Sequence, residues 1–272
     1  MSDFPPPIID THAHLDDAAF DGDRPDVLKR ARQAGVQRVL NIAYRPEIWE
    51  QSVRLRQAHP DVELAAGIHP QDATIFNAKH ADALAEQLLA LSPLAVGEAG
   101  FDFARPGPTL QEQRVAFQWQ IQLAIAAGLP LVIHQRDAAE QLTKELDRWP
   151  ELRAIVLHSF DGDVRLAAWA LDRGCYAGIG GLACRKSSHM LREALQILPV
   201  EKLILETDAP YLAPPGAASR RNEPANLPLV ADTLAPLWNL TPEDLCRHTT
   251  ANAMTVFRFP PDGVRYMREA CA

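Results

Sequence analysis

Short apolar segments alternate along the chain with longer segments whose apolar residues recur at helical spacing. The first apolar segment is the pair Ile8-Ile9, and we expect its strand to end within residues 10–16. Seven later segments have the length and composition of buried strands, at 38–43, 62–70, 94–98, 131–134, 154–158, 176–179 and 202–206. Predicted helices separate them, at 24–35, 46–59, 78–91, 110–128, 138–149, 164–174 and 190–198.

This alternation predicts an α/β fold, a (β/α)8 barrel of the TIM type, for which about 250 residues are typical. The alternative is a doubly wound open sheet, but the first strand–helix turn lacks a Gly-x-Gly-x-x-Gly motif. A proline-rich loop at 210–228 and helical segments at 229–237 and 242–257 follow the last strand. We expect these extra C-terminal helices to close the bottom or side of a single domain, 1–272.

The composition is that of a globular protein and excludes a disordered or fibrous chain. Apolar residues make up 47% of the chain and charged residues 23%, as in ordinary globular proteins. The net charge of −8 does not indicate a broad nucleic-acid surface, so a phosphate-bearing substrate would need a local cluster or bound cations. With no signal-like start and no apolar stretch of membrane-spanning length, we expect a cytoplasmic protein without membrane contact. The scattered cysteines, expected to be free thiols, are Cys175, Cys184, Cys246 and Cys271.

Polar residues at the ends of the predicted strands supply the candidate chemistry. Side chains alternate along a strand, so His12 and His14 point to the same face. Neutral imidazole suits zinc, iron, nickel or copper, and one pair needs further ligands. Other polar residues that end or follow strands are His69, Glu98, His134, His158 and Asp208. The carboxyl ends of barrel strands meet at the rim where active sites form.

Any one of these residues could be a core or rim residue without a ligand. As a set, four histidines, one glutamate and one aspartate have the right composition to hold two cations, as in a two-metal hydrolase. His69 would then face the pocket and contact substrate. Asp10 and Glu206 precede His12 and Asp208 by two residues, and we expect each to orient a ligand.

Longer motifs run in order along nearly the whole chain: DTHAHLD at 10–16, GIHP at 67–70, GEAGFD at 97–102, IHQRDA at 133–138, HSF at 158–160, ETDAPYL at 206–212, RNEPAN at 221–226 and TTANA at 249–253. Together they resemble the TatD family of metal-dependent hydrolases, within the amidohydrolase superfamily. The resemblance implies a TIM barrel with metal-dependent DNase activity. The departures from the family pattern at Ala99, Phe101 and Ser159 remove no ligand.

The resemblance also implies a division of the ligands between two metals. His12, His14 and Asp208 would hold one, His134 and His158 the other, and Glu98 would bridge them. The two divalent ions per chain would be magnesium, manganese, zinc or cobalt. We expect a metal-activated water to attack phosphorus in line, with Asp208 and Glu98 as the catalytic residues and Asp208 accepting the proton. Alternatively, Asp208 is only a ligand.

Three further residues are candidates for substrate contact, besides His69. Arg136 follows His134 by two residues and leans to the same face, where its guanidinium could bind phosphate oxygens bidentately. An ion pair with Asp102 or Asp137 is the alternative. Arg221 and Asn222, in the loop after the last strand, are expected to cover the substrate. The adjacent Arg220 either joins them or lies in solvent.

These observations favour a monomeric nuclease with an exonuclease-like action on single-stranded DNA ends. An acidic chain without a basic stripe suits an enzyme that grips one strand end through metals and a few arginines. The five tryptophans fall on predicted helices, which favours core packing over base stacking. One alternative is hydrolysis of an amide, ester or lactone, including aminoacyl-tRNA deacylation. A second alternative is a metal-binding protein without catalytic activity. The set of six candidate site residues argues against it, because six such residues are hard to explain without a function that uses them all.

Overall fold

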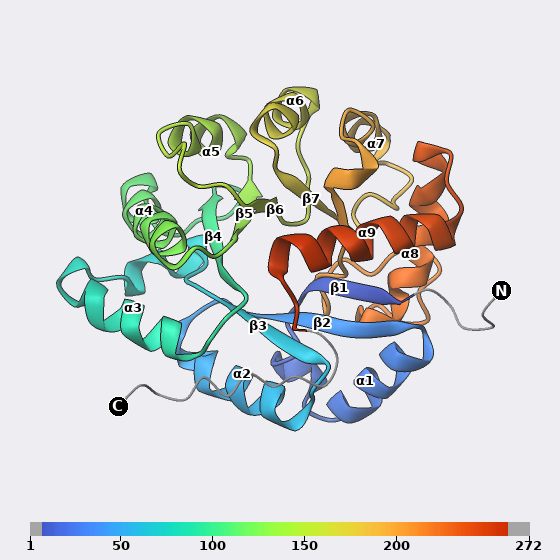
Figure 1. Ribbon diagram of the computed structural model, residues 1–272, viewed down its shortest axis with the longest axis horizontal. Coiled ribbons are helices and arrows are strands. Elements are labelled where there is room, and N and C mark those ends of the chain that lie inside the picture. Colours follow the sequence, from blue (N-terminus) through green and yellow to red (C-terminus); the bar gives the residue numbers. More distant parts are fainter. Residues whose placement is uncertain (1–6, 261–272) are drawn as a thin grey trace.

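The computed structural model describes residues 7–260 and confirms the (β/α)8 barrel (Figure 1). Its eight strands are parallel and pair in chain order. They are β1 (Ile8–Ala13), β2 (Val36–Ala43), β3 (Val62–Ala66), β4 (Ala95–Asp102), β5 (Leu131–Arg136), β6 (Ile155–Leu157), β7 (Tyr176–Ile179) and β8 (Leu203–Leu205).

Helices surround the strands, as Figure 1 shows. Those that follow strands are α1 (Arg24–Gln33), α2 (Pro46–Ala58), α3 (Ala81–Ala90), α4 (Leu110–Ala127), α5 (Ala139–Leu146), α6 (Val164–Arg173) and α7 (His189–Leu195). Two more, α8 (Leu227–Leu234) and α9 (Pro242–Phe257), follow β8. Local sequence fixes many ends: the Thr109 and Glu112 side chains form a capping box on α4, and Gly128 ends that helix in the left-handed conformation.

The first and last strands meet at a seam near their carboxyl ends. Ala13 forms a parallel bridge with Ala209. The backbone N–H of His14 donates to the Ala209 carbonyl at 2.7 Å, and that of Asp208 donates to the His12 carbonyl at 2.8 Å. The seam therefore joins the backbone segments of three candidate ligands.

The other end of the barrel is closed by α9, as expected for the C-terminal helices. Apolar side chains from seven strands form an inner cluster with Phe257 and Phe259. Near the strand starts, Asn252 Nδ2 donates to the carbonyls of Val200 and Leu203, each at 2.8 Å. The barrel is therefore open to solvent at the carboxyl ends of the strands, where the polar residues lie.

Two predicted strands end four residues away from their predicted C-terminal ends. The strand predicted at 62–70 ends at Ala66, because the chain then turns at Gly67 towards a 3-10 helix at Pro70–Ile75. The strand predicted at 94–98 continues to Asp102 and pairs with β5 up to Arg136.

Within the described residues, no helix combines the length and hydropathy needed to cross a bilayer. Cys175, Cys184 and Cys246 are free and buried, as expected. Cys271 lies outside the described residues.

Candidate metal centre and its pocket

The two histidines of β1 converge with the aspartate that follows β8. Single ligand atoms of His12, His14 and Asp208 all lie within 4.8 Å of one another. Asp208 Oδ1 is 3.3 Å from His14 Nε2 and 3.9 Å from His12 Nε2. The buried carboxylate of Asp10 accepts hydrogen bonds from the N–H and hydroxyl of Thr207, which fixes the backbone beside Asp208.

Glu98 lies between this group and a second pair of histidines. Its Oε2 is 3.5 Å from His12 Nε2 and 4.0 Å from His14 Nε2. Its Oε1 is 2.7 Å from His134 Nδ1 and 3.5 Å from His158 Nε2. One carboxylate therefore directs one oxygen to each histidine pair, as a bridging ligand between two cations would.

An irregularity in β4 places Glu98. The register with β5 shifts between Val96 and Ala99, and bulges of this kind re-aim side chains. Gly97 and Gly100 have φ of +129° and +145°, and any Cβ there would lie within 2.4 Å and 2.1 Å of β5 carbonyl oxygens. These two glycines permit the close approach of β4 to β5.

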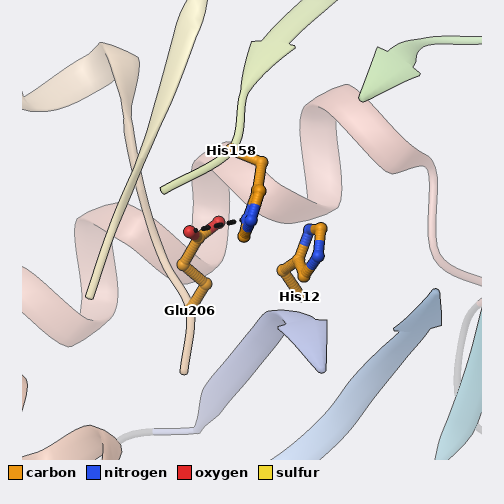
Figure 2. Close-up of side chains that lie close together, drawn as sticks. All are labelled: His12, His158 and Glu206. Carbon is orange, nitrogen blue, oxygen red and sulfur yellow. Dashed lines mark ion pairs between the residues drawn. The ribbon is translucent and has the colours of Figure 1, made fainter. Parts of the chain in front are cut away.

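The carboxylate of Glu206 lies next to the Nδ1 atom of His158 (Figure 2). This Nδ1 lies 3.0 Å from Glu206 Oε1, and the His158 ring stacks on that of His12 with 3.3 Å between the centroids. Glu206 fits because Gly178 has no side chain: a Cβ there would lie 2.0 Å from Glu206 Oε2. A proton on Nδ1 would leave Nε2 free to bind a cation.

The electrostatics of the site suit cations. Burial would raise the pKa of Glu98, but the charges of His158 and His12 hold it well below its usual value. Burial would lower the pKa of His158, yet the carboxylates around it, Glu206 foremost, raise it to about 10. Both ring nitrogens of His12 are buried without a hydrogen-bond partner. Such orphaned donors and acceptors, beside carboxylates kept ionised, fit a site built for divalent metals.

The metal-ligand candidates open into a cavity of about 670 Å³. Among the described residues, five arginines line it, and none of their guanidinium groups forms an ion pair or a side-chain hydrogen bond: Arg45, Arg105, Arg136, Arg185 and Arg220. Five carboxylates line the same cavity, so the acidic and basic side chains balance in number: Asp72, Glu98, Asp102, Asp161 and Asp208. In a chain of net charge −8, the arginines supply local contacts for an anion beside a cluster of carboxylates that could hold cations.

Two of the predicted substrate contacts line the pocket. Arg136 does so, and neither Asp102 nor Asp137 forms an ion pair with it in the described residues. His69 accepts a hydrogen bond on Nδ1 from the Gln71 N–H at 3.0 Å. Burial lowers the pKa of His69 to about 3, so the neutral ring carries its proton on Nε2, 4.0 Å from Glu98 Oε1.

The other two do not reach the pocket. The Arg221 guanidinium bonds Asp23 and Glu223 at 2.7–2.8 Å. Asn222 is fully buried, and its side chain donates to the Thr207 carbonyl at 2.8 Å. Both residues hold the loop after β8 in place, and the adjacent Arg220 is the one that faces the cavity.

Several pocket residues were missed by the sequence reasoning. Asp102 Oδ2 lies 3.3 Å from His134 Nε2, on the side of that ring away from Glu98. The signal for Asp102 was its place in the motif at 97–102, but β4 was expected to end at Glu98. Arg45, Arg105 and Arg185 lie in loops, where the sequence carries no periodicity that shows which way a side chain points.

Comparisons with known proteins find relatives over almost the whole chain. The family model described as TatD related DNase matches residues 9–258. A protein of Salmonella typhimurium named 3'-5' ssDNA/RNA exonuclease TatD is 38% identical over 256 residues, covering 92% of this chain and 98% of its own. A relative of the same name from Edwardsiella piscicida is 38% identical over 258 residues, covering 92% and 99%.

Solved structures show the same architecture. YJJV, a TatD homologue from Escherichia coli, superposes with a TM-score of 0.85 at 28% identity, over 93% of this chain and 98% of its own. A TatD-family hydrolase from Entamoeba histolytica has a TM-score of 0.83 at 20% identity, over 95% and 100%, a likeness that shows the fold alone.

Proposed function

This chain belongs to the TatD-related DNase family, and we propose that it is a divalent-metal-dependent exonuclease acting on single-stranded DNA or RNA from the 3' end. The observation that carries the proposal is one cavity in which Glu98 lies between two histidine pairs and which is lined by five arginines that form no ion pair within residues 7–260. Phosphodiester hydrolysis needs that combination, because the substrate and its transition state are anionic.

We propose two metal positions in this cavity. His12, His14 and Asp208 would hold one ion, His134 and His158 the other, and Glu98 would contact both. Divalent ions held there would activate the attacking water and neutralise charge on the phosphate. Histidine-rich ligation favours zinc, manganese or cobalt, while magnesium is an alternative for catalysis.

The chain's own residues have distinct tasks in this proposal. Asp208 would accept the proton of the attacking water, because this carboxylate is ionised and lies at the proposed metal position: burial would raise its pKa, but the hydrogen bond with His14 and the charge of His158 hold it below its usual value. Arg136 would bind a phosphate oxygen. The Nε2–H of His69 would donate to an oxygen of the substrate.

The monomeric state stays a prediction of the sequence, as does the cytoplasmic location.

The test uses metal-depleted protein and single-stranded oligonucleotides labelled at either the 5' or the 3' end. Each divalent ion is added back separately. We expect stepwise shortening of the 5'-labelled strand with at least one ion, and loss of turnover in Asp208→Asn protein that still binds metal. No cleavage with any ion, or cleavage only of small esters and amides that is unaffected in Arg136→Ala, would contradict the proposal.

A further inference from the structure

Two tyrosine rings line the cavity beside the first metal group, and the proposed metal chemistry uses neither. Tyr44 follows β2 and Tyr211 lies in the loop after β8. Both rings pack edge-on against the imidazole of His14, at centroid distances of 5.3 Å and 5.9 Å. Aromatic surface from two distant segments therefore meets at one candidate ligand.

Tyr211 is unusually accessible for an aromatic residue. Its relative exposure is 52%, and among the described residues it is the one aromatic member of the exposed large apolar set. No other member of that set lines the cavity. Apolar surface left exposed in a concave site indicates a ligand that covers it.

The loop that carries Tyr211 is fixed in position. The Tyr211 hydroxyl donates to Asp17 Oδ2 at 3.1 Å, and its backbone N–H donates to the Asp208 carbonyl at 2.7 Å. The Asn222 N–H donates to the Pro210 carbonyl at 2.9 Å. At Gly181 a Cβ would lie only 1.8 Å from the Leu212 carbonyl oxygen, so the loop packs directly on backbone. The ring is thus ordered before any ligand arrives.

A cation completes this surface. The guanidinium carbon of Arg45 lies 5.3 Å from the centroid of the Tyr44 ring. Its Nε is buried and has no hydrogen-bond partner. An aromatic face beside an unsatisfied guanidinium donor matches the two parts of a nucleotide, a flat base and a phosphate.

We propose that Tyr44 and Tyr211 form a nucleobase subsite beside the metal centre, with Arg45 contacting the adjoining phosphate. This inference rests on the proposed function and explains its strand preference. A base that stacks on these rings must leave its partner strand, so only unpaired ends fit. The proposed subsite uses tyrosines from the segments after β2 and β8 and none of the five tryptophans, of which Trp149 was expected in a helix but lies past the end of α5.

The experiment measures binding in EDTA, where cleavage is absent, by fluorescence anisotropy of 5'-labelled ten-nucleotide DNA. Three strands are compared: the intact strand and strands that lack the base at the terminal or at the penultimate 3' position. Loss of a stacked base weakens binding by about 5- to 100-fold. The proteins are wild type, Tyr211→Ala, Tyr211→Phe and, as a control for lost exposed apolar surface, Met190→Ala, whose parent side chain is 66% exposed outside the cavity.

We expect Tyr211→Ala to bind the intact strand about 5- to 100-fold more weakly than wild type does. On the strand that lacks the stacked base, Tyr211→Ala and wild type should bind equally. Tyr211→Phe and Met190→Ala should bind like wild type. Equal losses by Tyr211→Ala on all three strands would overturn the subsite. Wild type that shows this coupling in EDTA but cleaves nothing with any divalent ion would overturn the proposed function and leave the subsite standing.

Discussion

Oε1 of Glu206 lies 3.0 Å from Nδ1 of His158. The same oxygen accepts a hydrogen bond from the Ser159 N–H at 2.5 Å. A carboxylate on Nδ1 holds the imidazole with Nε2 directed at Glu98, 3.5 Å from its Oε1. Glu206 therefore orients a proposed metal ligand that comes from another strand, whereas its place in the sequence, two residues before Asp208, indicated a nearer partner.

Replacing Glu206 with glutamine should weaken metal binding at the His134–His158 position by about 10- to 100-fold, because the amide removes the charge that favours the Nδ1–H form of His158. Titration of metal-depleted protein with zinc or manganese measures the change. Glu201→Gln, at an exposed position before β8, serves as the control. Equal affinity in Glu206→Gln and wild type would remove this role.

A methyl group at position 178 should also weaken metal binding, because it would displace the Glu206 carboxylate. In Gly178→Ala the new Cβ would lie 2.0 Å from Glu206 Oε2, so either the carboxylate or β7 must move. Overpacking of this kind costs about 1–3 kcal/mol, and we expect a lower Tm together with weaker metal binding. Gly22→Ala is the matched control, since nothing lies within 4 Å of a Cβ there. Wild-type behaviour of Gly178→Ala would show that the barrel yields at this contact.

Adjacent arginines should give opposite phenotypes. Arg220→Ala should weaken single-strand binding and reduce its salt dependence while leaving the Tm unchanged, because Arg220 lines the cavity without an ion pair in the described residues. Arg221→Ala should lower the Tm by a few degrees with little effect on binding, because it breaks ion pairs with Asp23 and Glu223. Anisotropy at several salt concentrations and thermal unfolding measure both. The reverse pattern would restore Arg221 as the substrate contact.

The stability penalty of Arg221→Ala should depend on pH. Hydrogen bonds from Arg221 and Arg30 hold the pKa of Asp23 well below its usual value. A carboxylate with a lowered pKa stabilises the fold above its ordinary pKa and loses that contribution as the pH falls. The difference in Tm between wild type and variant should therefore shrink in acid. A difference that stays constant from pH 7 to pH 3 would rule out this linkage.

Ionisation of Asp161 should destabilise the fold, whereas ionisation of Asp23 stabilises it. Burial raises its pKa from 3.8 to about 6, although Gln135 Nε2 donates to its Oδ1 at 2.5 Å. The raised pKa disfavours the folded state once the carboxyl must ionise, so the cost is absent below pH 4 and complete above pH 6. Asp161→Asn should raise the free energy of unfolding above pH 6 by up to about 3 kcal/mol. Denaturant unfolding in EDTA, with Asp172→Asn as a surface control, tests it; no gain at pH 8 would contradict it.

The barrel and the convergence of the candidate ligands were predictable because both follow from strand periodicity. Residues such as His134 and His158 end apolar runs, and parallel strands bring such ends to one rim. The bridging geometry of Glu98 was less accessible, since it depends on the shifted register between Val96 and Ala99. Alternation alone gives no account of that shift.

Loop residues mark the limit of the sequence reasoning. Arg220 and Arg221 have the same charge and neighbouring positions, yet one faces the cavity and the other pairs with Asp23. Arg221 turns away from the cavity partly because of one carboxylate, Asp23, that lies nearly 200 residues away in the chain. Tyr211 likewise became a candidate only when its exposure and its contact with His14 were seen.

The seam between β1 and the segment after β8 has a consequence for biosynthesis. Two proposed ligands, His12 and His14, lie on the β1 side of this seam. The third, Asp208, lies on the other side, after the last strand. A ribosome must therefore translate past residue 208 before the nascent chain can gather a full ligand set. Chains that terminate before residue 208 would carry the motif at 10–16 but lack one of the six proposed ligands, so we expect them to have no nuclease activity.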